Sequence, residues 1–206
     1  MATKEFILQG FTNRSHKDVI RSLFGVAGIN RVLISAAYVT EHGVRHIEDL
    51  LQSNSAHVLV FAGIRNDATS YQGMLKLKSL HDATIYAVDT GSHGVLFHPK
   101  IYMVKGANQA RAVIGSANLT LGGINNNIEG SMSFRFDLGI PDDLQAVNSI
   151  ERAFTDSIAA FPNHVIEVTG QPMMEEMISQ GRLIDEDVVR PPRPTAPGIC
   201  TAVAED

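Results

Sequence analysis

The sequence predicts an α/β domain with a mixed, mostly parallel central sheet and helices on both faces. Two observations support this class. Continuous apolar runs of strand length lie at 31–37, 57–62 and 84–88, which is typical of strands that are buried on both faces. Helix-like segments alternate with these runs, and a strand–helix–strand order predicts neighbouring parallel strands with helices above and below them.

The first 89 residues contain the alternating part of this pattern. Ser15 is the expected N-cap of the first helix, because its hydroxyl can accept a hydrogen bond from a backbone N–H of the first turn. We expect strands at 6–10, 31–37, 57–62 and 84–88, and helices at 15–27, 43–52 and 69–80.

The rhythm changes after Asp89. Two short strands flank Gly106-Ala107-Asn108, whose residue types form turns, so this part predicts a hairpin. A further alternating strand and two amphipathic helices follow. We expect strands at 100–104, 111–114 and 128–136, and helices at 141–161 and 172–180.

The C-terminal end differs in composition from the rest. Residues 190–198 contain four prolines in nine residues, which excludes a helix or an internal strand. We therefore expect one domain at 1–188 and a proline-rich linker or disordered tail at 189–206. A recognition or motor component attached there would fit such a linker.

Composition points to a cytoplasmic protein. Cys200 is the single cysteine of the chain, so an internal disulfide and a thiolate metal cluster are excluded. The apolar runs are far shorter than the roughly 20 residues that cross a bilayer. The N-terminus has no basic region followed by a long apolar segment, so we expect neither a signal peptide nor a membrane partner.

Charge is unevenly distributed along the chain, whose net charge is −5. Residues 1–135 hold 13 Lys and Arg against 9 Asp and Glu, whereas residues 136–206 hold 4 against 13. A polyanion would be attracted to the first part, and the acidic part would then face away from it.

The residues most able to do chemistry lie between Phe97 and Glu129. His98 and Lys100 are two apart in an extended segment, so their side chains share a face. If the next strand is the hairpin partner, Asn118 returns beside His98, and Glu129 can reach the same edge from the strand that follows.

This set of side chains suits phosphoryl transfer. A neutral imidazole can attack phosphorus and hold the phosphoryl group covalently. An ammonium and an amide can bind the non-bridging oxygens, a role that Mg²⁺ fills in other enzymes. A carboxylate can orient the histidine. Because no acidic cluster accompanies the set, we expect neither a metal ion nor another cofactor.

At these positions the sequence resembles the phospholipase D superfamily, whose signature is HxK followed by GSxN. The segments HPKIY and IGSANLTLGGINNNIE look most like its single-motif nuclease branch, which includes restriction endonucleases. The resemblance implies a phospholipase D-like fold, with His98 as nucleophile or acid and Lys100 and Asn118 as phosphate ligands. It implies further that Glu129 supports the histidine and that Ser116 touches phosphate.

One departure concerns the longer family signature, which has an aspartate where this chain has Lys105. This departure weakens the case for a lipid substrate. If the Lys105 side chain faces the cleft, we expect it to contact DNA. Family members with one motif per chain pair two chains across a twofold axis, so the resemblance implies a homodimer with the active site at the interface.

We therefore predict a metal-independent DNA phosphodiesterase, the catalytic domain or subunit of a restriction-type endonuclease, with a fused or separate recognition or helicase component. The alternatives are a nonspecific nuclease or lipid phosphodiesterase of the same superfamily, or an inactive nucleic-acid-binding module.

Other polar residues are weaker candidates. Tyr38, Thr40 and Arg65 follow predicted central strands, whose carboxyl ends line the binding crevice of open α/β sheets, so they are candidate substrate contacts. His93 lies in the loop before the motif and is read as a solvated residue. His42 and His46 have helical spacing without a third ligand nearby, and are read as surface residues.

Overall fold

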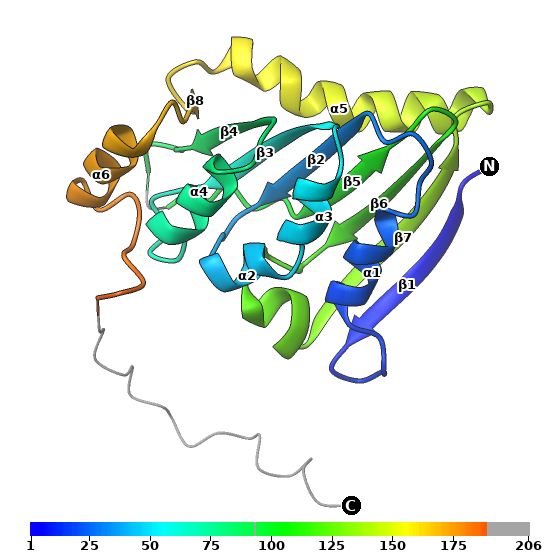
Figure 1. The fold of residues 1–206 in the computed structure, drawn as a ribbon, viewed down its shortest axis with the longest axis horizontal. Helices are drawn as coiled ribbons and strands as arrows, with labels where there is room; N and C mark the ends of the chain where they lie inside the picture. Colours follow the sequence, from blue (N-terminus) through cyan, green and yellow to red (C-terminus); the bar gives the residue numbers. More distant parts are fainter. Residues whose placement is uncertain (93, 189–206) are drawn as a thin grey trace, which may run out of the picture.

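A computed structural model describes residues 1–92 and 94–188 of the chain. His93 and the predicted linker at 189–206 therefore lie outside the described residues. The model contains a sheet of eight strands in the order β1-β7-β6-β5-β2-β3-β4-β8, with helices above and below it (Figure 1). The strands are β1 (Thr3–Gln9), β2 (Arg31–Ala36), β3 (His57–Gly63), β4 (Ala83–Val88), β5 (Ile101–Lys105), β6 (Gln109–Gly115), β7 (Glu129–Asp137) and β8 (Val165–Glu167).

The sheet is mixed, as predicted, but the balance between parallel and antiparallel pairs differs. Only β2–β3 and β3–β4 are parallel among the described strands, and the other five neighbouring pairs are antiparallel. The reason is that the β5–β6 hairpin joins β2 from the side, and β7 and β1 extend it antiparallel. The prediction of a mostly parallel sheet therefore holds only for β2, β3 and β4.

Helices cover both faces of this sheet, as predicted. On one face lie α1 (His16–Leu23), α2 (Glu41–Arg45), α3 (Glu48–Ser53), α4 (Tyr71–Lys78), the π-helical turn η1 (Gly122–Asn126) and α6 (Gln171–Ser179). The other face packs against α5 (Pro141–Ala160), the long helix at the top of Figure 1. No helix within the described residues has the length and apolar character needed to cross a bilayer.

Local chemistry explains where the first helices begin and end. The Ser15 hydroxyl accepts a hydrogen bond from the Asp18 backbone N–H at 3.1 Å, which confirms the predicted cap. The helix ends at Leu23 rather than at residue 27, because Phe24 and Gly25 close it with tighter i→i−3 bonds.

The helix expected at 43–52 is two helices, α2 and α3. The Arg21 guanidinium binds the His46 carbonyl at 2.9 Å, which removes that acceptor from the helical ladder. Ile47 has a non-helical backbone and is completely buried. Its burial in the core accounts for a break that propensity alone does not predict.

The short strand β8 was not predicted, since three residues carry no periodic signal. It forms the edge of the sheet beside β4, and the Val88–Val165 pair brings the end of α5 back to the core.

Phe154 gives a direct test of the α5 packing. Its side chain is 8% exposed and its ring centroid lies 5.0 Å from that of Phe61. We expect Phe154→Ala to lower the free energy of unfolding by about 3–5 kcal/mol, because it removes buried surface and leaves a cavity. Urea denaturation measures this. The matched control is Phe161→Ala, whose side chain is 58% exposed; equal losses for the two variants would contradict the packing described.

Candidate active site

The predicted site residues lie together along the edge of the sheet that is formed by strand ends. His98 and Lys100 directly precede β5, Ser116 and Asn118 follow β6, and Glu129 begins β7. Because these strands are antiparallel neighbours, with Ile101 opposite Ile114 and Gly115 opposite Ser131, the start of one lies beside the end of the next. The predicted hairpin is confirmed, and all of these residues meet at what we call the catalytic edge.

The His98 imidazole is exposed at this edge and packs edge-on against Tyr38, with ring centroids 6.2 Å apart and an interplanar angle of 77°. Partial burial lowers the pKa of His98 from its ordinary value of 6.5, and the nearby Lys100 ammonium lowers it further. The neutral imidazole, which is the nucleophilic form, is therefore favoured near pH 7.

Lys100 is only 4% exposed, which is unusual for a charged side chain. Its Nζ donates a hydrogen bond to the His98 backbone carbonyl at 2.9 Å. Burial lowers the pKa of Lys100, while the negative charge of Glu129 opposes that shift. An ammonium in this position can stabilise negative charge on a bound phosphate more strongly than one in water.

The Asn118 amide is oriented by the backbone that directly follows β2. The Tyr38 N–H donates to Asn118 Oδ1 at 3.0 Å, an assignment that follows from the hydrogen-bond network. Asn118 Nδ2 is thus left as the donor that a substrate oxygen could use. Tyr38 therefore contacts both His98 and Asn118, and its contact with substrate stays a prediction.

The loop after Asn118 is fixed by close packing. A Cβ atom on Gly123 would lie 2.4 Å from the Asn118 carbonyl oxygen and 2.6 Å from its nitrogen. This loop contains two consecutive glycines, Gly122 and Gly123. In the structure they start the π-helical turn η1, and Gly123 also lets that turn rest directly on the Asn118 backbone.

Glu129 has partners other than the one expected. Its carboxylate accepts hydrogen bonds from the Ser116 hydroxyl and, at 3.2 Å, from Asn127 Nδ2. The Gly130 N–H also donates to the Ser116 hydroxyl, at 3.1 Å. Within the described chain no hydrogen bond joins Glu129 to His98. Its support of a histidine, and a Ser116 contact with phosphate, stay predictions.

A buried polar group lies behind Glu129 and was missed from the sequence. His16 is completely buried; its Nε2 lies 2.7 Å from the Ser131 hydroxyl and its Nδ1 3.3 Å from Gln9 Oε1. Burial lowers the pKa of His16, and the charge of Glu129 opposes this. Along β7, Ser131 alternates with Glu129, Ser133 and Arg135, which are all polar, so no local pattern in the sequence marks Ser131 as buried.

The weaker candidates separate into three outcomes. Thr40 lies at the catalytic edge, but its hydroxyl caps α2 by accepting from the Gly43 N–H at 3.3 Å. Arg65 also lies there, and its guanidinium is paired with Asp89. Lys105 is at the opposite end of β5 from Lys100 and binds Glu151 at 2.6 Å. The five-residue length of β5 therefore separates Lys105 from the catalytic edge, so we correct its assignment as a DNA contact.

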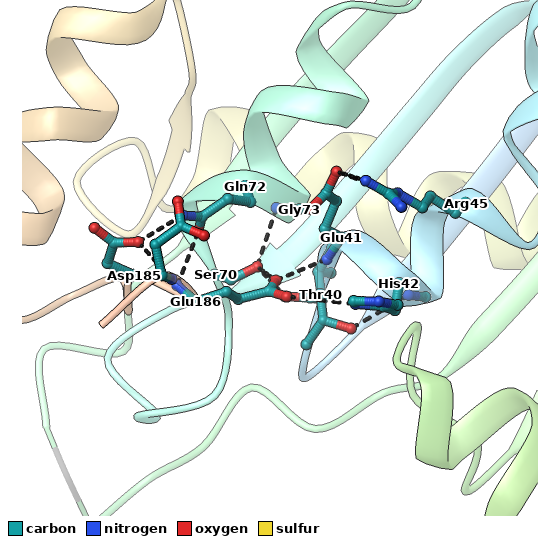
Figure 2. Close-up of polar contacts among 12 residues, drawn as sticks. Thr40, Glu41, His42, Arg45, Ser70, Gln72, Gly73, Asp185 and Glu186 are labelled. Carbon is teal, nitrogen blue, oxygen red and sulfur yellow. Dashed lines mark hydrogen bonds and ion pairs between the residues drawn. The ribbon is translucent and has the colours of Figure 1, made fainter. Parts of the chain in front are cut away.

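The acidic C-terminal part is divided between two places. The helix α5 carries Asp142, Asp143, Glu151 and Asp156 and lies away from the catalytic edge, as expected. Asp185 and Glu186, by contrast, lie beside Thr40 and Ser70, which follow β2 and β3 (Figure 2). Carboxylates are stabilised at helix N-termini, and α2 and α4 begin there. The expectation that the acidic part faces away is thus only half correct.

Fold and site together define a class of protein. An HxK pair at the start of one strand, a GSxN segment after its hairpin partner and a glutamate on the next strand are the arrangement of phospholipase D-type phosphodiesterases.

Residues 18–159 match the family model of the NgoFVII restriction endonuclease N-terminal PLD domain. The chain therefore belongs to this family and is a DNA-cleaving phosphodiesterase of the phospholipase D type. No curated protein sequence matches the chain.

Solved structures share the fold at low sequence identity. NucT from Helicobacter pylori is 12% identical with a TM-score of 0.60, over 82% of this chain and 100% of its own. Nuc from Salmonella typhimurium, a phospholipase D family member, is 11% identical with a TM-score of 0.56 over the same shares. A polyphosphate kinase from Porphyromonas gingivalis is 14% identical with a TM-score of 0.53, over 75% of this chain and 26% of its own.

The titration of His98 tests the electrostatics of the site. We expect its pKa, measured by NMR, to lie below 6.5. In Lys100→Met the pKa should rise without reaching 6.5, because burial, the larger cause, remains. The control Lys4→Met removes an equal charge from the exposed strand β1 and should leave the His98 midpoint unchanged. A midpoint at or above 6.5 in the unsubstituted chain would contradict this description.

Proposed function

We propose that this chain hydrolyses DNA phosphodiester bonds without a metal ion, through a phosphohistidine intermediate on His98. The observation that supports this best is the exposed imidazole of His98 beside the buried side chain of Lys100, whose ammonium binds the His98 carbonyl. The proposed nucleophile, His98, and the positive charge of Lys100 lie on the same short segment. His98 is exposed at the catalytic edge, where DNA can reach it.

The proposed reaction has two steps. In the first, an imidazole nitrogen of His98 forms a bond to phosphorus while the bond to the leaving oxygen breaks. Lys100 and Asn118 Nδ2 bind the non-bridging oxygens, whose negative charge increases in the transition state. In the second, water attacks phosphorus and the bond between phosphorus and the imidazole breaks.

Both steps need a proton carrier in addition to the nucleophile. The leaving oxygen requires a proton, and the attacking water must lose one. Each chain has one HxK motif. We therefore propose a homodimer in which the partner subunit's His98 donates the first proton and accepts the second. Glu129, which lies near the edge without bonding its own His98, would be free to orient a histidine from the other chain.

The biological setting belongs to the same proposal. The family match is to the N-terminal domain of a restriction endonuclease. We infer that this chain is the catalytic domain or subunit of such an enzyme, in the cytoplasm, and that a fused or separate component recognises the target sequence.

Plasmid nicking in EDTA tests the chemistry. We expect the wild-type chain to nick supercoiled DNA with all divalent ions chelated, and His98→Ala to be slower by at least about 1,000-fold, because the nucleophile is lost. Glu129→Gln should slow nicking less and leave the fold intact, as judged by thermal unfolding. His81→Ala, an exposed histidine outside the site, is the matched control. Absence of nicking by the wild type, or equal nicking by His98→Ala, would remove the enzymatic proposal.

A mixed dimer tests the shared site. Wild-type and His98→Ala chains carrying different tags are co-expressed, and the dimer that holds one of each is purified through both tags. If one reaction uses both imidazoles, this dimer should be inactive, whereas two independent sites would keep about half of the wild-type activity. Half activity, or a monomeric wild-type chain that still cleaves, would contradict the proposed dimer.

A further inference from the structure

Two arginines share a single buried carboxylate at the carboxyl ends of β3 and β4. The Arg65 guanidinium binds Asp89 in a bidentate manner, with Nε 2.8 Å from Oδ1 and Nη2 2.9 Å from Oδ2. Arg182, which follows α6, places its Nε 3.3 Å from Asp89 Oδ2. The backbone joins the two arginines as well, because the Arg65 N–H donates to the Arg182 carbonyl at 2.9 Å.

The carboxylate satisfies Arg65 but not Arg182. Besides the two bonds from Arg65, Asp89 Oδ1 accepts one from the Gly91 N–H at 2.9 Å. The Arg182 guanidinium makes no hydrogen bond to any part of the chain that the structure describes, and its buried Nε meets Asp89 as an ion pair without forming a hydrogen bond. The Arg65 hydrogen bond is the main reason why the pKa of Asp89 is lowered. Asp89 is therefore ionised, and within the described residues its single negative charge faces two guanidinium groups.

Acidic residues close to Arg182 in sequence are engaged elsewhere. Figure 2 shows Asp185 and Glu186 turned toward the start of α4 and α2. Asp185 accepts from Gln72 Nε2 at 2.5 Å, and Glu186 accepts from the Glu41 backbone N–H at 2.8 Å and from the Ser70 hydroxyl. The carboxylates of Asp185 and Glu186 thus bind at the starts of α4 and α2, and not to the Arg182 guanidinium.

The position of this cluster relates it to the catalytic edge. Asp89 and Arg65 follow β4 and β3 at the edge where His98 precedes β5. β5, β2, β3 and β4 are consecutive in the sheet, and a strand spacing of about 4.8 Å puts β4 about 14 Å from β5. The side chains of Arg65 and Arg182 are 24% and 28% exposed, so an anion can reach them while much of each is held in place.

We propose that Arg182, with Arg65 beside it, binds a DNA backbone phosphate a few nucleotides away from the scissile one. A guanidinium binds phosphate in a bidentate manner and stays charged at every physiological pH. Asp89 is the positioning residue that fixes Arg65 and limits the movement of Arg182. The inference rests on the proposed function, since it assumes that DNA crosses the catalytic edge.

DNA binding in a cleavage-deficient background tests the subsite independently of the chemistry. Affinity for a fluorescent duplex is measured as a function of salt in His98→Ala, with and without Arg182→Gln. Loss of one phosphate contact should weaken binding about tenfold and reduce the slope of log K against log salt by about 1. Arg152→Gln removes the same charge from α5 and should change both quantities far less. Arg182→Lys should recover part of the affinity but not all of it.

A second measurement covers the case in which Arg182→Gln fails to fold. An arginine-specific dicarbonyl reagent is applied to the His98→Ala chain with and without duplex, and modified sites are mapped by mass spectrometry. DNA should protect Arg182 and leave Arg152 reactive. Unchanged affinity and salt slope in folded Arg182→Gln, or equal reactivity of Arg182 with and without DNA, would overturn the subsite. Either result would leave the proposed cleavage reaction standing, because nicking in EDTA tests that reaction separately.

Discussion

A buried positive charge imposes the main constraint on this site. The Lys100 side chain is almost completely removed from water, and within the described residues its ammonium makes one hydrogen bond, to the His98 carbonyl. Burying a charge without full compensation costs several kcal/mol, so the protein must supply opposite charge or leave a place for it. Glu129 supplies part of this compensation through its field. The remainder is available to an anion, such as the phosphate diester that we propose as the substrate group bound here.

The neighbouring groups can be understood from the same constraint. Tyr38 packs edge-on against the His98 imidazole and, through its backbone N–H, orients the Asn118 amide so that Nδ2 is left as a donor. Ser116 and Asn127 hold the Glu129 carboxylate in place. These side chains leave little to reorganise when charge develops, which is the condition under which electrostatic stabilisation is most effective.

The sequence was sufficient for the centre of the site because the signal there is local. The period of a strand places His98 and Lys100 on one face, and a hairpin brings Asn118 back to them. It was insufficient where a side chain had two possible partners. Thr40 could bind phosphate or cap a helix, and in the structure its hydroxyl caps α2 by accepting from the Gly43 N–H. Lys105 was misplaced because its position depends on strand length, and the pairing of Arg182 with Asp89 depends on packing that no local pattern encodes.

The position of α5 has a consequence for how the molecule meets its substrate. This helix carries four carboxylates and one arginine and packs across one face of the sheet (Figure 1). The carboxylates of α5 repel a polyanion from the face of the sheet that this helix covers. A duplex that diffuses toward the protein is therefore deflected from that face before contact, and added electrolyte shortens the range of the repulsion.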